Sequence, residues 1–485
     1  MLYLTIPLML FFCFWTILPF ALLSTSLLVL VFALTFPQFH VHSDSVGVIR
    51  SEIIVSLVTA GLWTFSTGVW PGPFGRAGDW WDTRDDILST LTQHAWPVTH
   101  VFQGDVHSVT MRHYLSFYLP GSGIGKLFGS NVSITLFATG LWMMAGIALV
   151  FFMVLRFLHY FGKRKYLVIP IFVFFSGLDI VGGRIKGTVG LSPSRIIHGG
   201  HIEWWLPEFQ YSSFTTAFHW VPQHALSGWL GTLIVLRIFE KKKHYAFLPL
   251  LVSAIFLWST FTALGISIVI AMQAFQHLNF REGLRVMRRL IPSATICFIA
   301  VALLASYLLA NTSSIPKFPI FSHESYKLFG FSGPSRVLKD YLSFITFEFG
   351  IYIVLLYLLL KQFRREIALV AIVLCLIPLY RVGLFNDFAM RVSIPPLLIL
   401  MLLVTRGLLQ KSKHATSNFI RIGLLGMLVL GSVTPLYEFF SRFDADYKSL
   451  ETPCIDSGCG SQVAGNEIRD FYWSGDMPLF IKTGK

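Results

Sequence analysis

Four aspartates are crowded into the stretch GDWWDTRDDILSTL, residues 78–91. Asp79, Asp82, Asp85 and Asp86 recur at spacings of three and four, which place side chains on neighbouring faces of a helix. Crowded carboxylates raise at least one pKa unless a cation or a metal ion neutralises them, so the cluster suits a carboxylate base or a metal site. The alternative is helix capping on a solvated face. We expect Asp79 or Asp82 to be a catalytic base, with Asp79 the first choice.

Basic residues near these acids are candidates for binding a phosphate group. Arg84 lies within the aspartate cluster, and Arg391 lies in a second polar motif further along the chain. A guanidinium matches phosphate oxygens in bidentate geometry, so these two are the first candidates, followed by Lys126 and Arg336. The alternative for each of them is a salt bridge with an acidic loop.

The second motif, LFNDFAMRVSIPP at residues 384–396, stands at the entrance to an apolar stretch. Asn386 or Asp387 can cap the helix that begins there, and Arg391 follows Asp387 by four residues. Charged groups in the first turns of a membrane helix are costly unless they face a cavity, so the motif is a candidate substrate contact.

Histidines gather in the first half of the chain, in HGGH (198–201) and HWVPQH (219–224) among other places. These spacings are compatible with metal ligands, but neither is the HExxH motif. We therefore assign no cofactor and leave a divalent metal ion open. The candidate substrate contacts are Asp85, Asp86, His113, Tyr114, His201, Glu203, His219, His224, Asn386 and Asp387.

Membrane helices must position these residues, because 54% of the 485 residues are hydrophobic and 13% are charged. Soluble domains carry about 25% charged residues. Apolar stretches of bilayer-spanning length recur about thirteen times, and we take 246–275 as two crossings. The expected spans are 3–20, 22–36, 52–70, 131–157, 166–180, 222–238, 246–259, 261–275, 290–310, 343–361, 366–381, 391–407 and 418–435.

Short basic clusters between these stretches predict the orientation. They are typical of cytoplasmic loops and occur at 162–165, 240–243, 281–289, 361–366 and 410–413. The N-terminus is then cytoplasmic. The loops 71–130, 181–221 and 312–342 lie outside, where 113–129 and 202–220 suit interfacial helices. The net charge is +13, but many of the basic residues fall in the short clusters between apolar stretches and not in one patch, which argues against nucleic-acid binding.

We therefore expect one all-α, multi-pass domain over 1–435 and a short extracytoplasmic tail over 436–485. A bacterial inner or plasma membrane is the expected location. Cys454 and Cys459 in the tail can form a disulfide if the tail faces an oxidising compartment.

The first outer loop resembles that of membrane glycosyltransferases of the GT-C fold, the superfamily of protein O-mannosyltransferases and bacterial aminoarabinose transferases. DWWDTRDD, AWPV (95–98), HYLSFYLP and GKLFG (125–129) follow one another in the same order over about fifty residues. The chain departs from that pattern in its acidic motif, Asp82-Thr-Arg84, and in placing the loop after the third expected span rather than the first.

The resemblance implies an inverting hexosyl or pentosyl transferase of GT-C-like fold. Its partners would be a polyprenyl-phosphate-linked sugar and an extracytoplasmic glycan, lipid or protein acceptor. One alternative is an O-antigen polymerase or ligase with the same kind of donor. Another is a secondary transporter or flippase, which would place ionisable groups inside the membrane within inverted repeats. The sequence has few such groups apart from Glu348, and no clear repeat.

Overall fold

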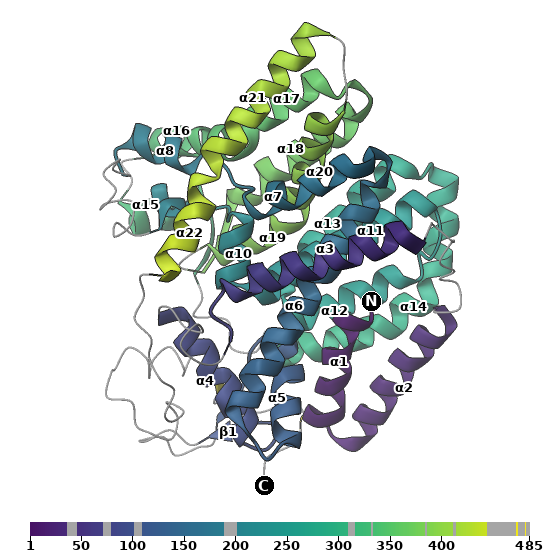
Figure 1. Ribbon diagram of the computed structural model, residues 1–485. Helices are drawn as coiled ribbons and strands as arrows, with labels where there is room; N and C mark the ends of the chain where they lie inside the picture. The colour runs from purple at the N-terminus through teal and green to yellow at the C-terminus, as the bar shows by residue number, and fades with distance from the viewer. Residues whose placement is uncertain are drawn as a thin grey trace.

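The computed structural model describes residues 1–35, 46–70, 79–100, 109–188, 201–308, 316–330, 333–383, 386–410 and 414–443, together with 472, 473 and 481. Within these ranges the chain is a helical assembly with a few strands of two or three residues (Figure 1). The all-α class expected from the sequence is therefore confirmed.

Five helices in the described part of the chain are long and apolar enough to cross a membrane. They are α6 (Val132–Phe157), α13 (Thr260–His277), α14 (Phe280–Leu308), the run Pro334–Leu359 and the run Ala415–Ser441. Shorter apolar helices are α1 (Leu2–Trp15), α12 (Phe247–Trp258) and α20 (Ile394–Leu409). These helices indicate a membrane protein, and the count of about thirteen spans stays a prediction.

The remaining larger helices complete the bundle. They are α2 (Leu18–Thr35), α3 (Val46–Phe65), α11 (Pro222–Lys241) and α18 (Arg364–Leu376). Aromatic rings fill the centre, where Trp63 of α3 lies 5.7 Å from Phe151 of α6 and 6.1 Å from Trp229 of α11, measured between ring centroids. These contacts join α3 and α6 to α11, the helix that carries His224.

The expectation for the stretch 246–275 is met, whereas that for the stretch 166–180 is not. The stretch 246–275 is two helices, as expected, because Ser259 leaves the helical conformation and its hydroxyl accepts the Thr262 amide of α13 at 3.1 Å. The stretch 166–180 is not one span: it contains α7 (Val168–Val173), an irregular segment and the start of α8 (Asp179–Lys186). There the Leu178 amide bonds to the Phe347 carbonyl at 2.9 Å, so neighbouring chain replaces the helical hydrogen bonds.

The run Pro334–Leu359 contains a π turn, Thr346–Gly350, between α16 (Pro334–Ile345) and α17 (Ile351–Leu359). The other long run consists of α21 (Ala415–Gly431) and α22 (Val433–Phe443). The expected boundary at residue 435 falls inside α22, which contacts α8 and α10 (Phe214–Trp220). Figure 1 shows α8, α16 and α22 gathered on one flank of the molecule.

Helices α4 (Asp79–Gln93) and α5 (Leu119–Leu127) form a pair against the end of α6 (Figure 1). Glycines permit the approach: a Cβ at Gly121 would lie 2.0 Å from the Thr139 hydroxyl, and one at Gly125 would lie 1.8 Å from that of Thr135. Beside the pair, β2 (Val109–Met111) joins β1 (Thr99–His100) to β5 (Tyr472–Trp473). Tail residues thus pair with the first large loop.

Two short elements bring further polar residues to this region. The 3₁₀ turn η2 (Leu115–Phe117) packs against α11 and α12, and α19 (Asp387–Val392) packs against α13. A separate two-stranded sheet joins β3 (Lys317–Pro319) to β4 (Tyr380–Val382), just before α19.

Candidate functional site

Arg84 is buried on α4, with 6% of its surface exposed. Its Nη1 donates to the His219 carbonyl at 3.2 Å, and its guanidinium also hydrogen-bonds the Tyr118 side chain. The neighbouring Asp85 and Asp86 are buried too, at 3% and 9% exposure. This half of the aspartate cluster therefore faces protein, not solvent.

The motif around Arg391 folds as its spacing predicts. Asn386 adopts the left-handed conformation (φ 55°) and its side-chain oxygen accepts the Ala389 amide at 3.4 Å, which caps α19. One turn later the Arg391 Nη2 donates to Asp387 Oδ1 at 2.6 Å. The cap and the ion pair together orient Arg391.

Two histidines lie in the electric field of both arginines. His113 follows β2, and His224 is in the first turn of α11. Burial, followed by repulsion from Arg391 and Arg84, lowers the pKa of His113 to about 3. The same two arginines act on His224. The His113 ring is therefore neutral at physiological pH and offers one donor and one acceptor nitrogen.

We call Arg84, Asp85, His113, Tyr118, His224 and Arg391 the two-arginine cluster. Tyr114 lies against it, because its ring centroid is 5.4 Å from that of His224 and its hydroxyl hydrogen-bonds Thr260 at 2.9 Å. The cluster joins α4, the residues on either side of η2, α11 and α19, and these segments are distant in sequence. Most residues expected to contact substrate in the first outer loop and the 384–396 motif are thus brought together.

Several buried polar atoms in this region have no hydrogen-bond partner among the described residues. They are Arg391 Nε, His224 Nδ1, Gln223 Oε1 and Arg112 Nη1. Buried polar groups are rarely left unsatisfied, so such a group calls for an explanation. A ligand that accepts hydrogen bonds from Arg391, Arg112 and His224 would satisfy three of these atoms. Because two of these donors belong to positively charged arginines, an anion suits the site best.

The site residues expected from the sequence do not include three members of this region. Arg112 is an outer cation that directly precedes the motif HYLSFYLP, and Tyr118 lies within that motif. Gln223 carries no such signal, because its proximity to the cluster results from the position of α11.

The other expected site residues lie elsewhere or outside the described side chains. Asp79 and Asp82 are in the first turn of α4, but their side chains are not described. Lys126 donates to the His94 carbonyl and lies 5.5 Å from the centre of the Trp96 ring. The Arg336 side chain lies 3.9 Å from Asp340 on the same helix. Cys454 and Cys459 lie outside the described residues. No contact in the described ranges joins Lys126 or Arg336 to the two-arginine cluster.

Glu203 belongs to a second polar group, which we call the acidic cluster: Asp179, Glu203, Glu348 and Glu438. His201 contacts this cluster through Glu438. The Glu203 carboxylate accepts the Ser213 amide at 2.8 Å and the Gln210 side-chain amide at 3.1 Å. Burial, followed by the charges of Asp179 and Glu438, raises the pKa of Glu203 to about 8. The sequence signalled Glu203 and Glu348 separately, but gave no reason to place them together.

Helix α10 runs between the two clusters. At its start, the Ser213 amide bonds to Glu203, and near its end the Trp220 Nε1 donates to Glu438 at 2.7 Å. Glu438 also accepts from His201 at 2.8 Å. His219, also on α10, makes two contacts: its ring nitrogen lies 3.1 Å from the Ser66 hydroxyl, and its backbone carbonyl accepts the hydrogen bond from Arg84.

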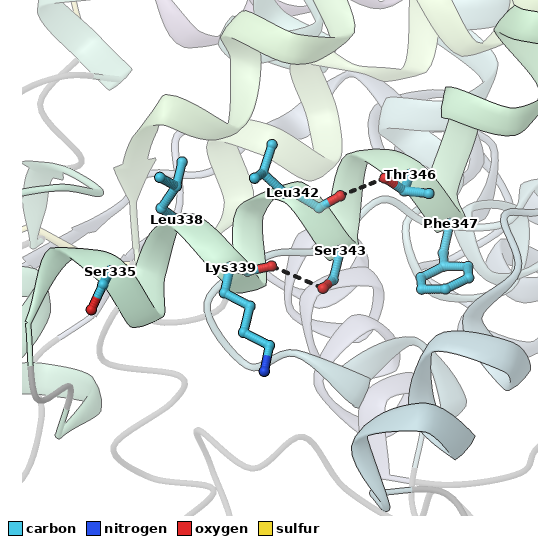
Figure 2. Close-up of a pocket in the computed structure, with 7 residues that line it drawn as sticks. All are labelled: Ser335, Leu338, Lys339, Leu342, Ser343, Thr346 and Phe347. Atoms are coloured by element: carbon cyan, nitrogen blue, oxygen red, sulfur yellow. Dashed lines mark hydrogen bonds between the residues drawn. The ribbon is translucent and has the colours of Figure 1, made fainter.

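A groove of about 510 Å³ follows the outer side of α16 and the π turn (Figure 2). Leu338, Leu342 and Phe347 give it an apolar wall, and Lys339 stands at its edge. It is lined by neither cluster. Within the described ranges, no three His, Cys, Asp or Glu side chains are placed to hold a metal ion.

Comparison with protein-family models, curated proteins and solved structures finds no match to this chain.

Proposed function

We propose that the chain is an integral-membrane glycosyltransferase that moves a sugar from a polyprenyl-phosphate-linked donor to an extracytoplasmic acceptor. The supporting observation is the two-arginine cluster, in which Arg391 keeps a buried Nε–H without a partner among the described residues. Arg84 supplies a second guanidinium, which is 6% exposed, and both arginines act on His113 and His224. Two guanidinium groups of this kind suit a phosphate at the end of a membrane lipid.

In this proposal the cluster stabilises charge on the leaving phosphate. Bond cleavage at the sugar carbon transfers negative charge to the phosphate oxygen, and fixed cationic donors favour that state over the ground state. His113 and His224 can add hydrogen bonds to the phosphate from their ring nitrogens. The acceptor hydroxyl needs a carboxylate within hydrogen-bonding reach, and the first turn of α4 supplies Asp79 and Asp82 as candidates.

The proposed topology follows from the basic loops. With 162–165, 240–243, 281–289 and 361–366 in the cytoplasm, α4, α5 and the two-arginine cluster lie at the outer face of the membrane. A multi-pass GT-C-like fold in a bacterial inner or plasma membrane accords with this arrangement. An O-antigen polymerase or ligase would use the same anionic donor group.

A second candidate is a secondary transporter or flippase of a lipid-linked substrate. The acidic cluster favours it, because Glu348 and Glu438 lie within two of the helical runs that are apolar enough to cross a membrane. Intramembrane carboxyl groups commonly serve ion or proton pathways.

The test is transfer of labelled sugar from a purified polyprenyl-phosphate donor, with donor binding measured in parallel. Arg391→Met should weaken donor binding at least tenfold, because it removes a charged hydrogen bond worth about 1.5–3 kcal/mol. Asp79→Asn or Asp82→Asn should reduce transfer by about 10²-fold or more with donor binding retained. Arg237→Met, which removes a half-exposed arginine, is the matched control.

Near-normal donor binding by Arg391→Met would remove the phosphate assignment. Near-normal transfer by both aspartate variants would leave the first turn of α4 as a cap. Binding without transfer by the wild-type protein, together with movement of the lipid across vesicles, would favour the transporter.

A further inference from the structure

Asp179 and Glu348 meet in the interior of the protein. Asp179 is fully buried at the start of α8, and its Oδ2 accepts hydroxyl hydrogens from Ser176 and Thr434, each at 2.9 Å. Glu348 is 5% exposed, and its Oε1 accepts the Trp205 Nε1 hydrogen at 3.1 Å. The two carboxyl groups are neighbours, because the Leu178 amide beside Asp179 bonds to the Phe347 carbonyl beside Glu348 at 2.9 Å.

One oxygen of this pair has no donor. Asp179 Oδ1 is buried, and no hydrogen of another described group reaches it. Ionised carboxylates only accept hydrogen bonds, so two of them cannot bond to each other without a proton between them. A proton on Glu348 supplies the missing donor.

Among the residues that the structure describes, no positive charge beside the pair replaces that proton. The titratable groups that face the pair are Glu203 before α10, Glu438 of α22, Tyr352 of α17 and Tyr211. His201 reaches the network only through Glu438. In the described part of the chain, no lysine or arginine contacts Asp179 or Glu348, and no set of ligands there suits a metal ion. Two adjacent buried anions without a cation would be strongly unfavourable.

The backbone around the pair is closely fitted. A Cβ at Gly177 would lie 2.3 Å from Glu348 Oε2 and 2.9 Å from Glu348 Cα. The π turn Thr346–Gly350 places Glu348 inward at this point, and such turns inside helices are frequent at functional sites. A Cβ at Gly431 would lie 2.8 Å from the Gly177 carbonyl oxygen, so α21 closes the other side. The contact is therefore built into three elements.

We propose that Asp179 and Glu348 form a buried proton-binding site that holds one shared proton at neutral pH. The ligand is the proton itself, which comes from water and returns to water with no change other than one O–H bond. The site goes beyond the proposed glycosyltransferase activity and does not depend on it. It joins α8, the π turn and, through Thr434, α22.

Infrared spectroscopy of the full-length protein in detergent tests the proposal, because a neutral carboxylic acid has a carbonyl stretch that a carboxylate lacks. The measurement is made in the Glu203→Gln background at neutral pH, so that Glu203 contributes no band. We expect a neutral-carboxyl band that loses one group's intensity in Glu348→Gln. In Asp179→Asn the band should keep its intensity but shift in frequency, because the protonated Glu348 loses the carboxylate that accepts its proton. Each amide replaces the shared proton with an N–H donor, so both variants should fold.

The matched control is Glu240→Gln. Glu240 is 46% exposed and pairs with Arg237 at 2.7 Å on the surface, so its replacement should leave the band unchanged. Absence of any neutral-carboxyl band in the Glu203→Gln protein would overturn the proposal. So would a band whose intensity is unchanged by Glu348→Gln, or whose frequency is unchanged by Asp179→Asn.

Discussion

Replacing Glu203 with glutamine should abolish a pH dependence of stability that the wild-type protein shows between pH 4.5 and about 8. Glu203 is 1% exposed, and burial is the main reason that its pKa is raised. The two nearby acids Asp179 and Glu438 raise it further, while hydrogen bonds from Ser213 and Thr216 act in the opposite direction.

The sign follows from proton binding. Between the unfolded pKa of 4.5 and the folded pKa of about 8, the folded state holds a proton on Glu203 that the unfolded state has lost. Stability is therefore fully present below pH 4.5 and falls as the pH rises through this window. A shift of this size corresponds to a loss of up to about 5 kcal/mol. Glutamine cannot ionise, so the variant should lack this contribution to the slope.

Thermal unfolding of wild-type and Glu203→Gln protein in detergent, at a series of pH values, provides the measurement. The Tm difference, variant minus wild type, should increase as the pH rises and should level off above pH 8. Glu240→Gln is the control, because Glu240 is 46% exposed and pairs with Arg237 on the surface. Parallel curves for Glu203→Gln and the wild type would refute the assignment.

Three further predictions concern packing, charge and topology. Gly177→Ala should destabilise the protein strongly, because the new Cβ would lie 2.9 Å from the Glu348 Cα. Gly283→Ala, in open space on α14, should instead stabilise it by about 0.5–1 kcal/mol, and the Tm values of the two variants test both expectations. Glu52→Gln should cost about 3–5 kcal/mol in unfolding experiments, since it leaves the buried Lys165 ammonium without its partner. A cysteine at residue 241 should react with an impermeant reagent only after the membrane is opened, and labelling from outside would contradict the orientation.

Local features of the site could be predicted from the sequence. The cap at Asn386 and the ion pair between Asp387 and Arg391 depend on spacings within one helical turn. The break between α12 and α13 likewise lies where polar residues interrupt an apolar stretch. In such cases the interacting groups are close in sequence, so a pattern specifies both partners.

The convergence of distant residues could not be predicted in this way. Asp179 and Thr434 are hydrogen-bonded although 255 positions separate them, and no local pattern relates them. The break inside the expected span 166–180 has the same origin, because the Leu178 amide is satisfied by a carbonyl of the π turn. Apolar composition indicated a helix there, whereas tertiary hydrogen bonds determined the backbone.

Helix α10 has a mechanical consequence for the whole molecule. Its seven residues are held at one end by Glu203, at the other by Glu438, and through the His219 carbonyl by Arg84. Because one short helix makes these contacts, a displacement of α22 that moves Trp220 also moves the neighbouring His219 carbonyl that binds Arg84. The positions of the side chains in the two clusters are therefore coupled through α10.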